Sequence, residues 1–115
     1  MKRDFELIRK LLLDIEGEQV DLRPFTEDQI LYHKALLLEA EMAEGPKPHY
    51  SSQKSSEIPD LVIIKKLTWE GHDFIDAIRN EGNWKKAKEW IKAAGKILTL
   101  ETIKEAIKTV LNSSA

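Results

Sequence analysis

The sequence contains no cysteine, and its longest uninterrupted hydrophobic runs are four residues long. Without thiols the chain cannot form disulfides, hold zinc or iron–sulfur clusters through thiolates, or use a cysteine nucleophile. The two longest runs, Ala35 to Leu38 and Leu61 to Ile64, are far too short to cross a bilayer. No hydrophobic signal segment follows the basic N-terminal residues. We therefore expect a cytoplasmic protein that makes no membrane contact.

Common catalytic signatures are missing as well. The chain has no Gly-x-Ser-x-Gly, no glycine-rich phosphate loop and no His-Glu-x-x-His. The four serines between residues 51 and 56 lie in a proline-rich stretch, which is a poor place to hold a preorganised nucleophile. His72 and Asp76 have helical spacing, but no second histidine or cysteine joins them. We expect a protein that is not an enzyme and that binds no metal or cofactor.

The side chains that are present fit one foldable domain. Of the 115 residues, 42% are hydrophobic and 33% are charged, which predicts a single soluble domain over residues 1–115. Charge is unevenly distributed, because residues 1–45 have a net charge of −5 and residues 46–115 a net charge of +3. Such asymmetry marks a partner surface or reflects charged side chains that only solvate helix faces.

Hydrophobic residues at helical spacing, together with capping residues, predict five helices. Thr26 and Gln29 are spaced for a capping box, in which each side chain bonds the backbone amide of the other residue. Gly17 and Gly95 suit positions just past helix ends, where a positive φ is often needed. The first two predicted helices cover residues 4–16, with Asp4 as the cap, and 27–43. A third runs from Thr68 to about residue 80, a fourth from an Asn83 cap to Gly95, and a fifth begins after a Thr99 cap.

Short strands and one long loop complete the predicted organisation. Residues 18–25 alternate in hydrophobicity, and Pro24 would place such a strand at a sheet edge. Residues 61–67 are rich in β-branched side chains and predict a second strand. Residues 45–60 contain three prolines and four serines, which predicts a flexible loop.

A strand–loop–strand pair placed after a helix is the organisation of a winged helix. In this interpretation residues 45–60 are the flexible wing loop, and the helix before them occupies the recognition position. The predicted fold class is α+β, mostly helical and winged-helix-like, with a short β-hairpin wing and two additional C-terminal helices.

Two segments resemble known proteins. Residues 28–40, with Tyr32-His33 before a leucine-rich turn, look like the third helix of bacterial winged-helix regulators. Residues 67–79, which begin with Leu67-Thr68 and continue to Gly71, resemble the Leu-Thr-x-x-Gly segment that follows their wing. Together with Met1 to Asp4, Leu7 to Lys10 and Trp84, residues 67–79 give a resemblance over nearly the full length. The chain resembles a family of small bacterial and prophage proteins that is catalogued as a domain of unknown function and is close to the YjcQ-like proteins. This resemblance implies a winged-helix-like fold and carries no activity with it.

The chain departs from that pattern in two places. Relatives close the second helix with Ala-Gly-Leu-Ile, whereas this chain has Ala40-Glu41-Met42-Ala43, so we expect the tight glycine turn to be missing or moved to Gly45. Only eight residues, which look extended, separate Gly17 from Thr26. The helix-turn-helix is therefore predicted to be incomplete, which weakens the analogy to DNA binding.

Few side chains are available to contact nucleic acid. Residues 26–44 hold one lysine and five acids, and this net charge of −4 repels phosphates. Basic residues at the N-terminus and in the wing offer another route to DNA, unless they only face solvent. The candidate contacts for nucleic acid or another partner are Lys2, Arg3, Gln29, His33, Lys34, Lys47, Lys54, Lys65 and Lys66.

The sequence leaves two classes of function open. One is a winged-helix regulator that binds nucleic acid through its wing and N-terminus. The other is a protein–protein interaction module on the same scaffold that does not bind DNA, which the negative charge of residues 26–44 favours. Homodimerisation fits both. Residues 85–108 have a net charge of +4, and we expect the nearby Trp84 and Trp90 to be core residues.

Overall fold

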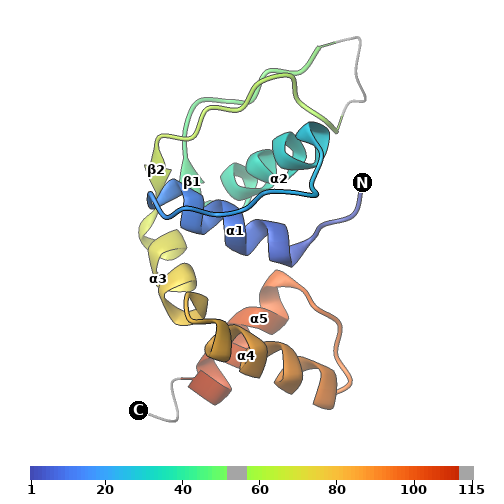
Figure 1. The fold of residues 1–115 in the computed structure, drawn as a ribbon, viewed down its shortest axis with the longest axis vertical. Helices are drawn as coiled ribbons and strands as arrows, with labels where there is room; N and C mark the ends of the chain where they lie inside the picture. The colour runs from blue at the N-terminus through green and yellow to red at the C-terminus, as the bar shows by residue number, and fades with distance from the viewer. Residues whose placement is uncertain (52–56, 112–115) are drawn as a thin grey trace. The chain divides into compact units, whose positions relative to one another are not determined.

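The computed structural model describes residues 1–51 and 57–111 as helices joined by a small antiparallel hairpin (Figure 1). The elements are α1 (Phe5–Ile15), α2 (Glu27–Glu39), β1 (Ala43–Glu44), β2 (Lys66–Leu67), α3 (Trp69–Ile78), α4 (Glu81–Ala93), α5 (Leu100–Ala106) and a final π-helix, η1 (Ile107–Leu111). The predicted fold class, α+β and mostly helical with a hairpin wing, is confirmed. The element order is compatible with a winged helix.

Backbone contacts divide the chain into two compact units, residues 1–72 and residues 73 onwards. The first unit contains α1, α2 and the wing, and the second contains α4, α5 and η1. The helix α3 begins in the first unit and ends in the second. The single domain expected over residues 1–115 stays a prediction.

The helix α1 forms where the sequence predicts it. The Asp4 side chain accepts hydrogen bonds from the backbone amides of Glu6, at 2.9 Å, and Leu7, at 3.2 Å, and so caps the first turn. Gly17, with a φ of +88°, follows the last turn. Leucines along one side of α1 are buried and the helix packs against α2. This packing provides most of the hydrophobic core of the first unit.

The predicted edge strand at residues 18–25 is wrong. The Phe25 amide bonds the Leu22 carbonyl at 2.9 Å, which closes a turn around a cis Arg23–Pro24 bond. The Asp21 carboxylate accepts from the Arg23 backbone amide at 3.0 Å and from its guanidinium. These local bonds, and a proline without an N–H, leave the segment without the donors that a strand ladder requires.

The helix α2 begins with the predicted Thr26–Gln29 capping box, but it ends at Glu39 and not at residue 43. Glu41 adopts a φ of +59°, and the Met42 amide then bonds the Leu37 carbonyl at 2.9 Å. This is the left-handed closure at which helices favour glycine. The tight turn expected to be missing or moved to Gly45 is therefore present at Glu41.

The wing is a hairpin with one constant register. The pairs Ala43↔Leu67, Glu44↔Lys66 and His49↔Leu61 keep the same offset along both segments. Regular pairing stops between them, where Pro46 and Pro48 have no N–H to donate. The strand predicted at residues 61–67 is therefore reduced to β2 and an isolated bridge. The centre of the predicted loop, residues 52–56, lies outside the described residues.

The segment Leu67-Thr68-x-x-Gly71 joins the wing to both neighbouring helices. The Thr68 hydroxyl donates to the Glu41 carbonyl at 2.6 Å and accepts from the Gly71 amide at 3.0 Å, while the Thr68 amide bonds the Met42 carbonyl at 3.0 Å. A methyl group at Gly71 would overlap the Met42 carbonyl oxygen. The motif that carried the resemblance is thus a structural junction.

In the second unit, α4 begins three residues earlier than predicted. The Asn80 side chain caps it by accepting from the amides of Gly82, at 2.7 Å, and Asn83, at 3.2 Å, so the predicted Asn83 cap is wrong. Trp84 is buried, as expected, and Trp90 is half-buried. The predicted Thr99 cap of α5 is confirmed.

The left-handed turn at Glu41 predicts that a glycine there stabilises the protein. Glu41→Gly should raise the free energy of unfolding by about 1 kcal/mol, because glycine adopts a positive φ without the steric cost of a Cβ atom. Urea unfolding measures the change. Glu41→Ala, which removes the carboxylate but keeps the Cβ atom, is the control and should show no comparable gain.

The close approach at Gly71 predicts that a methyl group there destabilises the protein. Gly71→Ala should lower the free energy of unfolding by about 1–3 kcal/mol, because the new atom meets backbone that cannot rotate away. The control Gly82→Ala places its methyl near only the Asn80 side chain and should cost much less. Equal melting temperatures for the two variants would contradict the role of Gly71 in this junction.

Candidate interaction surface

Two predicted contact residues of α2, the helix at the recognition position in the winged-helix interpretation, hydrogen bond backbone amides of the same chain. The Gln29 side chain accepts from the Thr26 amide at 2.8 Å to complete the capping box. His33 is fully buried; its Nε2 accepts from the Asp4 amide at 2.8 Å, and its Nδ1 lies 2.7 Å from the Gln29 carbonyl oxygen. The buried His33 cannot reach a base edge, and the side-chain oxygen of the half-buried Gln29 is already bonded in the cap.

The partners of His33 fix its protonation state. A backbone amide can only donate and a carbonyl oxygen can only accept, so the neutral ring carries its proton on Nδ1. Burial lowers the pKa of His33, and the hydrogen bond to Gln29 and the charge of Asp4 oppose that shift. The imidazole is therefore a structural link between the start of α1 and the middle of α2.

The surface that α2 leaves to solvent is acidic. Glu27, Asp28 and Glu39 are exposed, whereas Lys34, the one lysine of this helix, is half-buried. Phosphate groups dominate the affinity of proteins for nucleic acid, and they are repelled by such a surface. The exposure of these acids therefore agrees with the repulsion of phosphates expected from the net charge of residues 26–44.

The predicted basic contacts are exposed at the wing and at the N-terminus. Lys65 is exposed, and the Lys66 ammonium lies 3.6 Å from the Glu44 carboxylate across the hairpin. We call residues 43–50 the first wing segment and residues 57–67 the second. The N-terminal amine of Met1 lies 2.6 Å from the Glu57 carboxylate, which brings the start of the chain to the second wing segment. Lys2, Arg3 and Lys47 are also exposed, and Lys54 lies outside the described residues.

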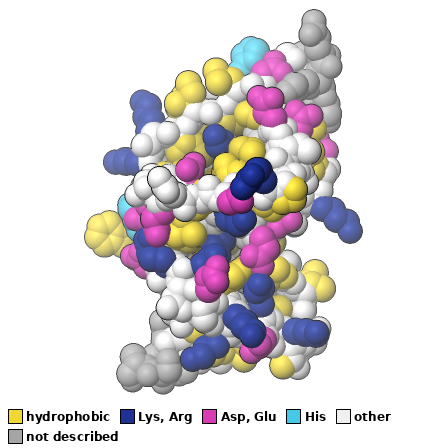
Figure 2. Space-filling view, in the orientation of Figure 1, with side chains coloured by type: hydrophobic (Ala, Val, Ile, Leu, Met, Phe, Trp, Pro, Cys, Tyr) yellow, Lys and Arg dark blue, Asp and Glu magenta, His cyan; other side chains and the backbone are white. Residues whose placement is uncertain are grey.

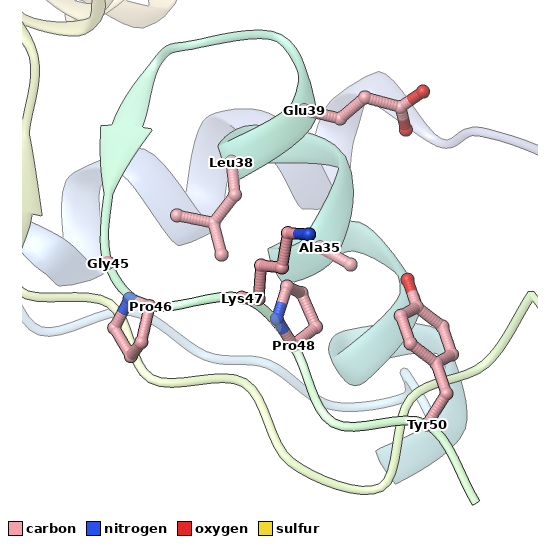
Figure 3. Close-up of a pocket in the computed structure, with 8 residues that line it drawn as sticks. All are labelled: Ala35, Leu38, Glu39, Gly45, Pro46, Lys47, Pro48 and Tyr50. Atoms are coloured by element: carbon pink, nitrogen blue, oxygen red, sulfur yellow. The ribbon is translucent and has the colours of Figure 1, made fainter.

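An open groove lies between α2 and the first wing segment (Figure 3). We name it the wing groove; its volume is about 480 Å³, and it is lined by Ala35, Leu38, Glu39, Gly45, Pro46, Lys47, Pro48 and Tyr50. Figure 3 shows the Lys47 side chain extended towards α2 and the Tyr50 hydroxyl turned towards the same helix. Hydrophobic walls with a few polar groups are typical of binding sites.

Sequence reasoning missed the wing groove because it treated residues 45–60 as loop. The available signal was Pro46-Lys47-Pro48-His49-Tyr50, in which an aromatic residue and two prolines interrupt an otherwise polar stretch. Pairing with residues 60–61 extends this segment alongside α2. Only that pairing shows which side of the segment meets the helix.

Large hydrophobic side chains are exposed near the wing. Trp69, the first residue of α3, is 86% exposed, and Leu61 and Ile63 on the second wing segment are exposed too. Figure 2 shows hydrophobic side chains at the surface among the charged ones. Three other large hydrophobic side chains of the same helix, Phe74, Ile75 and Ile78, are buried. The exposure of Trp69 is unexpected, because tryptophan side chains normally lie in a core or an interface.

The described residues hold no group of three or more histidine, aspartate or glutamate side chains arranged to bind a metal. The His72 ring instead lies 3.4 Å from the Glu16 carboxylate, and the His49 ring lies 3.6 Å from that of Asp60. Across the same part of the chain, no helix combines the length and hydrophobicity that a bilayer crossing needs.

Comparison with known proteins places the chain in a family. Residues 2–97 match the family described as "Hypothetical protein (DUF2513)". The chain belongs to the DUF2513 family. An "Uncharacterized protein" of Haemophilus influenzae (strain ATCC 51907 / DSM 11121 / KW20 / Rd) is 33% identical over 120 residues, which cover 97% of each chain. No solved structure matches. The predicted family of unknown function is thus confirmed, and the YjcQ-like relationship stays a prediction.

The burial of His33 predicts a loss of stability at mildly acidic pH. Because its pKa is lowered from 6.5 on folding, the unfolded chain takes up a proton that the folded protein resists, and the stabilisation present above pH 6.5 is lost as pH falls below it. Urea unfolding between about pH 7 and about pH 5 measures this loss. His33→Gln should flatten the dependence. An unchanged slope in His33→Gln would exclude His33 as its source.

Proposed function

We propose that this member of the DUF2513 family is a protein-interaction module, and that it holds a segment of a partner protein in the wing groove. The observation that supports this most directly is which side chains of α2 are bonded and which line a groove. Its two candidate base contacts, Gln29 and His33, hydrogen bond backbone amides of the same chain, while Ala35 and Leu38 of this helix line an open groove. A helix that reads DNA instead presents its polar side chains to the base edges.

The groove also limits how a partner would be held. Pro46 and Pro48 have no N–H, so the first wing segment is a poor edge for the addition of a further strand. Side-chain insertion between α2 and this segment is the mode that remains, with Leu38 and Tyr50 as hydrophobic walls. The partner therefore supplies a large hydrophobic side chain.

A second candidate function is nucleic-acid binding through the wing and the N-terminus. It is supported by the exposed Lys65, Lys2 and Arg3, and by the Met1–Glu57 ion pair that brings the N-terminus to the wing. Such binding would depend on phosphate contacts and would weaken steeply with salt. The resemblance to winged-helix and YjcQ-like proteins supports a regulatory role in a bacterial or prophage setting, in the cytoplasm and by binding instead of catalysis.

Two binding assays on the same preparation separate these functions. The first selects a displayed random peptide library on the wild-type protein and then measures the selected peptides on Leu38→Glu, which places a carboxylate in the groove. The second titrates a labelled random DNA duplex across a salt series, with the double variant Lys65→Glu and Lys66→Glu as its control.

We expect peptides with a large hydrophobic side chain that bind the wild type and lose at least about tenfold in affinity on Leu38→Glu. We expect no duplex binding that depends on Lys65 and Lys66. The opposite result would be tight, salt-sensitive duplex binding that the lysine variant abolishes, without any peptide that depends on the groove. That result would reject the interaction module in favour of the nucleic-acid regulator.

A further inference from the structure

Residues 1–4 form an extended segment, the N-terminal arm, that leads up to α1 within the first compact unit (Figure 1). The arm is bonded at both of its ends. The Met1 amine lies 2.6 Å from the Glu57 carboxylate, and the Asp4 amide donates to Nε2 of His33 at 2.8 Å. One of the two bonds that hold the arm therefore ends on a fully buried histidine.

The bond between Asp4 and His33 exists only while the imidazole is neutral. Nδ1 carries the one ring proton towards the Gln29 carbonyl, which leaves the lone pair of Nε2 to accept the Asp4 amide proton. A second proton on the ring converts Nε2 into a donor. Two N–H groups then face each other at a buried site, and each lacks an acceptor, which costs more than the lost hydrogen bond alone.

The carboxylate of Asp4 cannot repair this contact without a further loss. It already accepts from the amides of Glu6, at 2.9 Å, and Leu7, at 3.2 Å, in the cap of α1. It can bond a protonated Nε2 only by leaving those amides, which uncaps the helix. Tyr32, a second titratable side chain, lies edge-on to the imidazole, with ring centroids 5.3 Å apart, and has no carboxylate to offer. Protonation of the ring therefore loosens the start of α1 by either route.

Other charged side chains lie on α2 and on the two elements that pack against it. They are Glu6, Arg9, Lys10 and Asp14 on α1, Glu27, Asp28, Lys34 and Glu39 on α2, and Glu44 on β1. Lys10 donates to the Asp21 carbonyl at 2.8 Å, and Glu44 lies 3.6 Å from Lys66 across the hairpin. The pKa of His33 responds to Asp4 and not to these groups, so Asp4 is the charged residue that decides how the ring responds to acid.

Proton binding and departure of the arm favour each other. Burial lowers the pKa of His33, so the protein with its arm bound resists the proton. When the Asp4 amide leaves, Nε2 opens to water, which can accept from the protonated ring. The proton therefore binds the released state more tightly than the bound state, and acid shifts the population towards release.

We propose that His33 is a pH-sensitive switch that holds the N-terminal arm while its ring is neutral and releases the arm when the ring is protonated. The arm is bound at neutral pH and detaches as the pH falls below 6.5, the ordinary value for the ring. Release frees the exposed Lys2 and Arg3 from their place between α2 and the second wing segment. This inference is independent of the wing groove and of what the groove binds.

A spin label on the arm measures its release in the full chain. Because the chain has no cysteine, a nitroxide on Lys2→Cys labels the arm at a single position. Paramagnetic broadening of the Glu57 amide resonance, followed from about pH 7.5 to about pH 4.5, reports how near the arm stays to the wing. We expect the broadening to fall about twofold or more, with the midpoint of the His33 ring resonance, since half of the arms are released at that midpoint. In the unlabelled wild type, the Asp4 amide should titrate with the same midpoint.

Two variants separate the switch from the other bond of the arm. His33→Gln keeps an oxygen to accept from the Asp4 amide and an N–H to donate to the Gln29 carbonyl, but it does not titrate, so its broadening should stay constant. Glu57→Gln weakens the Met1 contact alone, and its Asp4 amide should still titrate with the ring.

Three results would overturn this inference. The first is a His33 ring that takes up its proton while the Asp4 amide and the broadening stay unchanged. The second is an equal loss of broadening in His33→Gln, which would assign release to carboxylates. The third is loss of all native amide resonances at the same midpoint, which would show global unfolding in place of a released arm. The ring and Asp4 titrations use the wild type, so the test stands even if His33→Gln does not fold.

Discussion

The hydrogen bonds of Thr68 are the interaction on which the first unit of this structure depends. One side chain and one amide bind the carbonyls of Glu41 and Met42 and receive the Gly71 amide, so the end of α2, the base of the wing and the start of α3 meet at a single residue. Gly71 makes this possible because any side chain would overlap the Met42 carbonyl. The left-handed turn at Glu41 points both carbonyls towards Thr68.

The junction and the buried His33 fix the wing and α2 through separate sets of contacts. The wing is held by backbone contacts at its base, while α2 is fixed to α1 through the buried His33, which bonds the Asp4 amide. Those bonds use side chains that the recognition position would otherwise present to a base. The same arrangement opens a hydrophobic groove beside α2 and leaves Trp69 in solvent. These features are the basis of the proposal that the protein binds a protein partner.

Predictions succeeded where the deciding interactions are local. Asp4, Thr26 and Thr99 cap their helices through bonds to residues no more than three positions away, which a sequence pattern can show. The prediction failed at residues 18–25, where a weak alternation suggested a strand although the Asp21–Arg23 bonds favour a turn. It also failed at Asn83, because Asn80 offers an equally good cap earlier in the chain. Neighbouring capping residues compete, and periodicity alone does not choose between them.

The sequence by itself determined the helical content, the caps at Asp4, Thr26 and Thr99 and the acidity of α2, since each follows from the order of neighbouring residues. Only the tertiary structure decided that His33 is buried, that Trp69 is exposed and that Leu38, Pro46 and Tyr50 share one groove. These properties depend on which distant segments meet. Burial is set by contacts between residues far apart in the chain, such as Asp4 with His33 and Met42 with Thr68, and no local pattern encodes that pairing.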